Sequence, residues 1–317
     1  MSKVIKKTPV PIAGLALALA ATGNLVLSYG AIYRNIFGTI SALLMILLTA
    51  KIFMDPKGTL ESLKNPVVAS VCPTFTMCLM LISNYIKPSL PNIAFGLWIL
   101  GLILHCLLII WFTMKFIFNF DIKKVFPSYF IVYVGIVVGS ITAPAYNLIA
   151  VGKGLFWFGL IAYLCLLPIV IYRVFIIKTI PEPALPTITI FAAPASLCLA
   201  GYIGSFQEKN IAMIWFLGVL SLVMFLAVLL YLPKMLKSKF YPSFSAFTFP
   251  LVISGIAMKQ TNGFLLKIEK PMAFLKYIIK FQEVLAVLIV LYALIKYFQF
   301  LFVKETISNS TTTGKTI

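Results

Sequence analysis

The ionisable side chains of this sequence limit the chemistry that its long apolar segments can carry out. The chain has eight acidic residues and one histidine. Glu283 is the only carboxylate within a long apolar segment. No nucleophile–base pair, metal-ligand spacing or ATP-binding motif can be recognised. We therefore expect no enzymatic activity, no metal site and no cofactor.

Small polar residues recur within five of the apolar segments, and none of these five segments holds a carboxylate. Hydroxyl and backbone N–H groups can solvate a small anion weakly, and weak binding lets an ion leave as well as enter. A cation path usually has rings of acidic side chains, which these segments lack. We expect an anion path lined by Gly14, Ser70, Thr74, Ser128, Gly135, Thr189, Ser196 and Ser245.

The composition is that of a membrane protein. Hydrophobic residues make up 62% of the chain and charged residues 11%, against about 45–50% and about 25% in soluble domains. The apolar runs are continuous and about twenty residues long, as in transmembrane helices. We predict an all-α polytopic protein integral to the cell membrane, meaning the plasma or inner membrane. Inner-face loops collect Lys and Arg, so the net charge of +18 indicates contact with membrane lipid and not with nucleic acid.

Charged or turn-forming residues separate ten apolar spans. We predict ten transmembrane helices, at 9–30, 35–54, 65–86, 90–118, 125–147, 154–178, 184–206, 209–233, 241–262 and 276–303. They define three regions of the chain: a cytoplasmic N-terminus at 1–8, a ten-helix pore domain at 9–303, and a polar C-terminal tail at 304–317 that we expect to be disordered.

Prolines recur at a nearly fixed interval. The odd-numbered spans start near Pro11, Pro66, Pro127, Pro186 and Pro242. The intervals of 55, 61, 59 and 56 residues indicate a repeated helical hairpin. Three odd spans carry a second proline, which we expect to kink the helix: Pro73, Pro194 and Pro250. Because freed backbone groups are tolerated where they line a cavity, we predict five tandem hairpins, with the odd helices as an inner ring around a pore and the even helices as an outer ring.

The basic residues predict the orientation in the membrane. With the N-terminus inside, the outer side of the ten spans holds nine of the 26 basic residues: Arg34, Lys87, Lys153, Lys209, Lys259, Lys267, Lys270, Lys276 and Lys280. The other seventeen lie on the inner side, as the positive-inside rule requires. We therefore expect both termini in the cytoplasm.

Three stretches resemble the tellurite-resistance/dicarboxylate transporter (TDT) family, which includes bacterial tellurite-resistance proteins and plant guard-cell slow anion channels. PIAGLALA (11–18) is similar to its first helix, and APASLCLAGY (193–202) resembles its seventh. AFTFPLVISGIAMKQ (246–260) is similar to the ninth helix, which in the plant branch reads Tyr-Thr-Phe-Pro with a lysine after the helix. The ten-helix pattern extends the resemblance over 9–303.

The resemblance implies a pore through each protomer, assembly as a homotrimer, and a phenylalanine on the ninth helix that plugs the pore. Phe249 is the matching residue, because the plant branch has a tyrosine where this chain has Phe247. Phe247 is the second candidate for this gate. Lys259, at the outer end of the same helix, is a candidate for attracting anions or for reaching the membrane interface. We interpret His105 as a packing residue, with a role in proton coupling as the alternative, and Glu283 as a contact at a helix or protomer interface.

We predict an anion channel that conducts small anions through a pore in each protomer, gated by Phe249. The alternative is a proton-coupled carrier or efflux protein for C4-dicarboxylates or tellurite-type oxyanions. Proton coupling usually needs a titratable group in the path. The odd spans hold none apart from Lys259 near one end, which favours the channel.

Overall fold

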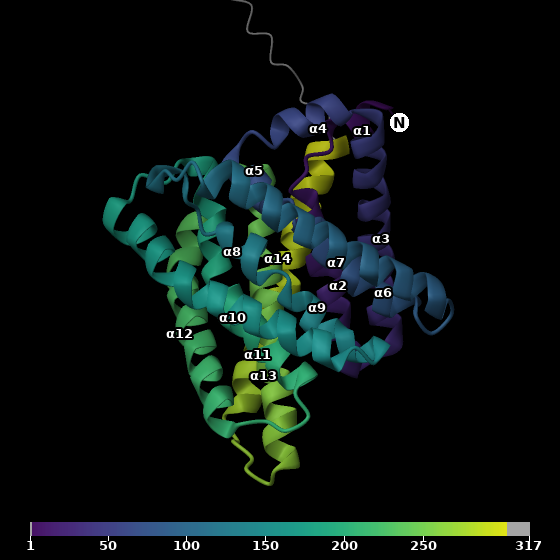
Figure 1. The fold of residues 1–317 in the computed structure, drawn as a ribbon, viewed down its shortest axis with the longest axis vertical. Helices are drawn as coiled ribbons and strands as arrows, with labels where there is room; N and C mark the ends of the chain where they lie inside the picture. Colours follow the sequence, from purple (N-terminus) through teal and green to yellow (C-terminus); the bar gives the residue numbers. More distant parts are fainter. Residues whose placement is uncertain (1, 303–317) are drawn as a thin grey trace, which may run out of the picture.

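The computed structural model describes residues 2–302, and those residues form helices without any strand (Figure 1). Eight of its helical segments are long and apolar enough to cross a membrane. The other two predicted spans, 9–30 and 241–262, correspond to the shorter helix α2 (Ile12–Leu25) and to the 3-10 helix η7 (Pro242–Phe247) followed by α13 (Phe249–Lys267). The prediction of a polytopic all-α membrane protein is confirmed. The predicted tail at 304–317 lies outside the described residues.

All five odd-numbered spans contain two or more helical pieces, and in 9–30 these are α2 and the short 3-10 helix η1 (Leu27–Tyr29). Together with α2, these inner helices are α5 (Pro66–Val71) with α6 (Thr74–Ile86), α8 (Tyr129–Val134) with α9 (Val137–Thr142) and η4 (Ala143–Tyr146), η6 (Glu182–Ala192) with α11 (Ala193–Ser205), and η7 with α13.

The prolines explain three of the breaks in the inner helices. Pro73 lies between α5 and α6, and Pro194 and Pro250 are the second residues of α11 and α13. A proline in the first turn of a helix costs little, because the N–H it lacks would have no partner within the helix. The break between α8 and α9 falls at Gly135 and Ile136, where the chain has no proline.

The five even-numbered spans are continuous outer helices. They are α3 (Ala31–Met54), α7 (Pro91–Phe112), α10 (Ile149–Ile171), α12 (Ile211–Met235) and α14 (Leu275–Phe302). Two of them, α7 and α10, continue as single wide π-helical segments at Thr113–Ile117 and Tyr172–Ile177.

Burial separates the inner from the outer helices. In the most apolar 18-residue window, the buried share is 61% for Pro66–Ile86, 67% for Tyr129–Tyr146 and 94% for Glu182–Ser205. It is only 22% to 39% for the outer helices. Helix α2 is buried along its whole length except at Asn24 and packs against α3, α6, α13 and α14. The outer helices thus enclose the inner ones and leave their large apolar side chains exposed for lipid.

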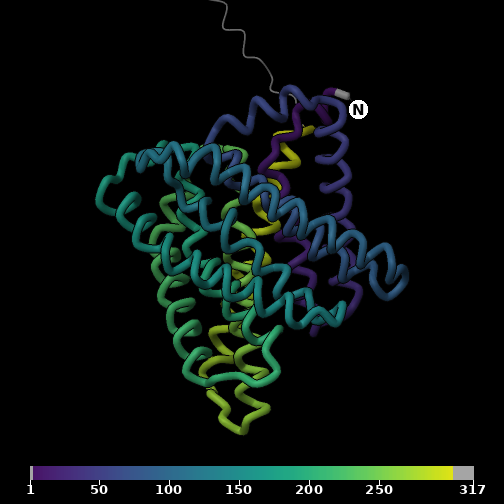
Figure 2. Tube along the Cα trace, in the orientation of Figure 1, coloured from purple at the N-terminus to yellow at the C-terminus, as the bar shows by residue number. Residues whose placement is uncertain are grey.

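The two ends of the described chain lie on the same side of the molecule. Lys7, at the end of α1 (Ser2–Lys7), has its Nζ 4.5 Å from the ring centroid of Phe300 in α14. Figures 1 and 2 show the N-terminal segment beside the last turns of α14. We call this side the N-terminal face and the other side the opposite face.

A local ion pair fixes the chain on the N-terminal face. Asp55 caps α4 (Pro56–Ser62) by accepting a hydrogen bond of 3.0 Å from the backbone N–H of Gly58. It also forms a salt bridge with Lys51, whose Nζ donates to the carbonyl oxygen of Lys6 at 2.8 Å. The hydrogen bond from Lys51 holds the pKa of the Asp55 carboxyl below its usual value, with a smaller contribution from the Gly58 N–H.

Candidate functional site

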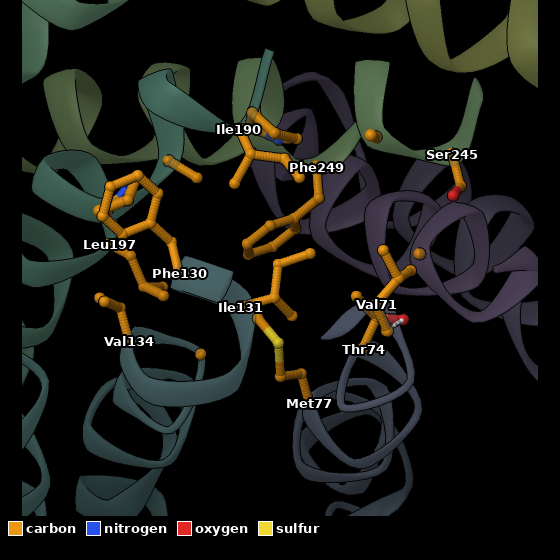
Figure 3. Close-up of a pocket in the computed structure, with 16 residues that line it drawn as sticks. Val71, Thr74, Met77, Phe130, Ile131, Val134, Ile190, Leu197, Ser245 and Phe249 are labelled. Atoms are coloured by element: carbon orange, nitrogen blue, oxygen red, sulfur yellow. Dashed lines mark hydrogen bonds between the residues drawn. The ribbon is translucent and has the colours of Figure 1, made fainter. Parts of the chain in front are cut away.

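A small cavity lies at the breaks of the inner helices, and all five inner helices line it (Figure 3). Among its lining residues are seven that the sequence singled out: Gly14, Thr74, Gly135, Pro194, Ser245, Phe249 and Pro250. In the described part of the chain, no charged residue lines it, and only Thr74 and Ser245 contribute polar side chains. The structure therefore brings together four of the eight residues expected to line the path, within a largely apolar neck.

Phe249 occupies the middle of this neck. Its side chain is buried, and Figure 3 shows its ring among the lining side chains, facing Ile131. Of the described residues, Phe249 is the one that lines both this cavity and a second, larger cavity toward the opposite face. Its backbone is fixed at the junction of η7 and α13, where Thr248 Oγ1 donates to the Ser245 carbonyl oxygen at 2.6 Å. The break in this inner helix thus sets the direction of the ring.

The neck is narrow. The small cavity has a volume of about 30 Å³, and one water molecule needs roughly 10–15 Å³. The neck can therefore hold about two water molecules, which is far less than the hydration shell of an ion. The second cavity is about 340 Å³ by the same measure.

The two candidate gate residues have different surroundings. Phe247 is fully buried, and its ring centroid lies 5.0 Å from that of Phe244 in an edge-on arrangement. It lines neither of the two cavities. The geometry of Phe247 is that of a packing residue, whereas Phe249 lines both cavities.

Four of the residues expected along the path lie outside both cavities, and three of them form contacts between helices. The hydroxyl of the fourth, Thr189, is buried and has no hydrogen-bond partner among the described residues. Neither cavity is lined by Ser70, Ser128, Thr189 or Ser196. The hydroxyl oxygens of Ser70 and Ser128 are 2.6 Å apart and join the second inner helix to the third. Ser196 Oγ lies 2.7 Å from Ser221 Oγ in α12 and 3.1 Å from Ser254 Oγ in α13. Hydroxyl groups in membrane proteins commonly form such bonds across helices.

Backbone charge, not side-chain charge, gives the small cavity its electrostatic character. Thr74, Ala193 and Phe249 are the first residues of α6, α11 and α13, and all three line the cavity. A helix N-terminus carries about half a positive elementary charge and has N–H groups without partners in the helix. Because α5, η6 and η7 end at the same breaks, the carbonyl ends of these preceding segments offset part of the positive field of the three N-termini.

The second cavity contains a charged residue that sequence reasoning did not connect with the path. Its lining is apolar apart from Asn24, Arg34, Asn84 and Gln260. Arg34 belongs to the outer helix α3, and its position between two spans suggested only an interfacial cation. The rarity of arginine could have drawn attention to Arg34, because only Arg34 and Arg173 are arginines among the 26 Lys and Arg residues of the chain. Arginine is the basic residue best suited to bind oxyanions.

Lys259 is paired rather than free. Its Nζ lies 2.6 Å from Glu283 Oε1 and donates to the Leu25 carbonyl oxygen at 2.9 Å. The hydroxyl of Tyr29 donates to the other carboxylate oxygen of Glu283 at 2.6 Å. Lys259 lines neither cavity, so its role in attracting anions stays a prediction. Glu283 is buried and links α13 to α14 within one chain.

His105 has the surroundings of a packing residue. It is buried, its Nε2 lies 3.1 Å from the carbonyl oxygen of Val132, and its Nδ1 lies 2.7 Å from Thr76 Oγ1. Within residues 2–302, no three His, Cys, Asp or Glu side chains form a group that could hold a metal ion.

The comparisons with known proteins agree with this architecture. Residues 10–298 match the SLAC1 family, described as voltage-dependent anion channel. Two proteins of Methanocaldococcus jannaschii, both named uncharacterized transporter, are similar to the chain. One is 27% identical over 65% of this chain and 67% of its own length. The other is 28% identical over 62% of this chain and 64% of its own length.

The family match extends over nearly the whole ten-span region, including α2, α11 and α13, where the short resemblances to the TDT family lie. It confirms that resemblance, and it indicates a channel or transporter rather than an enzyme. The chain is thus an integral membrane protein that belongs to the SLAC1 family of anion channels and transporters.

Proposed function

We propose that each protomer conducts small anions passively along the axis of its five inner helices, and that the ring of Phe249 closes this path. The observation that carries the proposal is the position of Phe249, which alone among the described residues lines both cavities. Movement of this ring would join the two cavities. An apolar constriction of this kind can gate a channel by excluding water.

The electrostatics support anions as the permeant ions. No carboxylate lines either cavity in the part of the chain that the structure describes. Three helix N-termini meet at the neck, and Arg34 lines the larger cavity. The net charge of +18 raises the local concentration of anions around the protein.

The same cavities favour a channel over a proton-coupled carrier. Coupling needs a group that gains and loses a proton within the path. Among residues 2–302, Arg34 alone provides an ionisable side chain to the lining of these cavities, and arginine stays protonated in proteins. A carrier for C4-dicarboxylates or tellurite-type oxyanions is the second candidate function, because the two archaeal relatives are named transporters.

Reconstitution into planar bilayers with chloride, nitrate or malate separates the two functions. We expect ohmic single-channel currents that reverse at the equilibrium potential of the anion. Malate uptake driven by a pH gradient, without current steps, would identify a carrier and overturn the proposal. Protein-free bilayers and bilayers with heat-denatured protein are the controls.

We further propose that both termini face the cytoplasm and that the protein assembles as a homotrimer. The orientation follows from the seventeen basic residues assigned to the inner side, and the trimer from the family. Labelling of a single cysteine introduced in α1 or α4 with an impermeant maleimide tests the orientation in intact cells. Native mass spectrometry of the purified protein tests the number of subunits.

A further inference from the structure

We propose that Arg34 forms a binding site for a planar oxyanion, of the nitrate or carboxylate type, in the second cavity. This inference rests on the proposed anion path, and it identifies where an anion binds on the far side of Phe249 from the small cavity. The cavity is large enough for a partly hydrated anion, at about 340 Å³.

The side chain of Arg34 is held in place by two inner helices. Its Nε donates to Asn24 Oδ1 at 3.1 Å, and its Nη2 donates to the backbone carbonyl oxygen of Asn84 at 3.3 Å. The guanidinium carbon lies 3.9 Å from the ring centroid of Tyr85. Contacts with α2 and α6 thus bring a cation from an outer helix to the edge of the central path and fix its orientation.

The contacts with the protein leave one edge of the guanidinium group available. Nε and Nη2 lie on the same side of the planar group, and the protein acceptors occupy that side. The end of the group, formed by N–H donors of Nη1 and Nη2, matches two oxygens of a planar anion. Among residues 2–302, the salt bridges do not include Arg34. Its charge therefore has no carboxylate to neutralise it.

Two residues that line the same cavity have amide oxygens without a hydrogen-bond partner among the described residues. Asn84 Oδ1 and Gln260 Oε1 are buried and have no hydrogen-bond partner in the described part of the chain. Buried polar atoms in proteins are rarely left unpaired. An amide can rotate to present either its N–H groups or its oxygen. Asn84 and Gln260 can thus donate to the anion or accept from its remaining water.

Two glycines leave space for the ring of Tyr85, which packs against the guanidinium group of Arg34. A Cβ at Gly23 would lie 2.8 Å from the Arg34 carbonyl oxygen and 2.4 Å from the Tyr85 hydroxyl. A Cβ at Gly38 would lie 2.4 Å from a ring carbon of Tyr85. Both glycines therefore allow the close approach of α2, α3 and Tyr85 that supports the guanidinium group from one side.

Calorimetric titration of the purified protein in detergent with sodium nitrate tests the site, at constant sodium concentration with a bulky sulfonate as the balancing anion. We expect saturable nitrate binding that Arg34→Gln weakens at least tenfold. Arg34→Lys keeps the charge but loses the paired donors, so it should weaken nitrate binding more than chloride binding. Lys87→Gln is the matched control, because Lys87 is a cation on the same face that lines neither cavity.

Gln260→Met tests the same site if the Arg34 variants do not fold. It removes an oxygen that has no hydrogen-bond partner among the described residues, so it should not disturb folding. We expect it to weaken nitrate binding several-fold without lowering the unfolding temperature. Absence of saturable nitrate binding in the unaltered protein would overturn the inference, as would unchanged binding in Arg34→Gln or, where that variant does not fold, in Gln260→Met.

Binding in detergent and current in bilayers separate this inference from the proposed function. Nitrate binding that depends on Arg34, in a protein that carries no current, supports the site and overturns the channel. Currents with nitrate binding that is independent of Arg34 support the channel and overturn the site.

Discussion

Replacement of Phe249 by alanine tests the proposed gate, because it removes the ring between the two cavities. The neck has room for about two water molecules in its present form, at about 30 Å³. A hydrogen bond to a charged group is worth roughly 1.5–3 kcal/mol. If the vacated space lets a passing anion keep one or two more waters, its barrier falls by about 3 kcal/mol. Since each 1.4 kcal/mol is about tenfold in rate, we expect roughly a 100-fold larger chloride current from Phe249→Ala.

The assay is macroscopic chloride current in planar bilayers, normalised to the amount of folded protein. Phe249→Leu keeps part of the apolar volume and should give an intermediate current. Phe247→Ala is the matched control, since Phe247 lies two residues away, is fully buried and lines neither cavity. Its loss of packing should lower stability by about 3–5 kcal/mol without raising the current.

Two results would refute the reasoning about Phe249. One is a current in folded Phe249→Ala that equals the current of the unaltered protein. The other is an equal rise in Phe247→Ala, because it would show that looser packing of α13, and not removal of the ring from the neck, opens the path.

Three further predictions concern stability, each measured as the unfolding temperature in detergent. Glu283→Gln leaves Lys259 without its carboxylate partner. Because the Lys259 side chain is 35% exposed, we expect the free energy of unfolding to fall by only about 1–3 kcal/mol, less than for a fully buried pair. Adding Lys259→Met to this variant should recover part of that loss. Gly23→Ala places a Cβ against the Arg34 backbone and should cost about 1–3 kcal/mol by overpacking, whereas Gly154→Ala, where the added Cβ has no neighbour within 4 Å, should cost little. Asp55→Asn should destabilise at pH 7. Because the folded-state pKa of Asp55 is lowered from 3.8, the difference from the unaltered protein should start to shrink as the pH falls below 3.8 and should disappear once the pH is below the folded-state pKa; a difference that does not shrink as the pH falls below 3.8 would contradict this assignment.

Local rules were enough to predict most of the fold. A proline in a first turn is tolerated wherever it occurs, so Pro11, Pro66, Pro127 and Pro242 located the starts of four inner helices, and Pro73, Pro194 and Pro250 located three of the breaks. Pro186 lies inside η6, past the start of that inner helix. The break at Gly135 has no proline. A Cβ there would lie 2.2 Å from the Ile131 carbonyl oxygen and 2.7 Å from Met77 Sδ, so the close approach of Met77 to this break, which the sequence does not reveal, needs a glycine.

The site was harder to predict because it depends on the rotation of each helix about its own axis. Ser70, Ser128 and Ser196 are as small and polar as Ser245, yet they face neighbouring helices while Ser245 faces the cavity. Residue type alone does not tell whether a serine side chain faces the cavity or a neighbouring helix. Arg34 was missed for a related reason, since its link to the path depends on Asn24 and Asn84, which the fold brings to it.

One chain supplies all five helices around the neck, and this has a consequence for assemblies of several copies. Under the proposed function each copy would hold a complete route of its own, so the conductances of neighbouring copies should add. Mixed assemblies of unaltered and Phe249→Ala chains should then show evenly spaced current steps with binomial frequencies, because every Phe249→Ala copy contributes the same increment whatever its neighbours are.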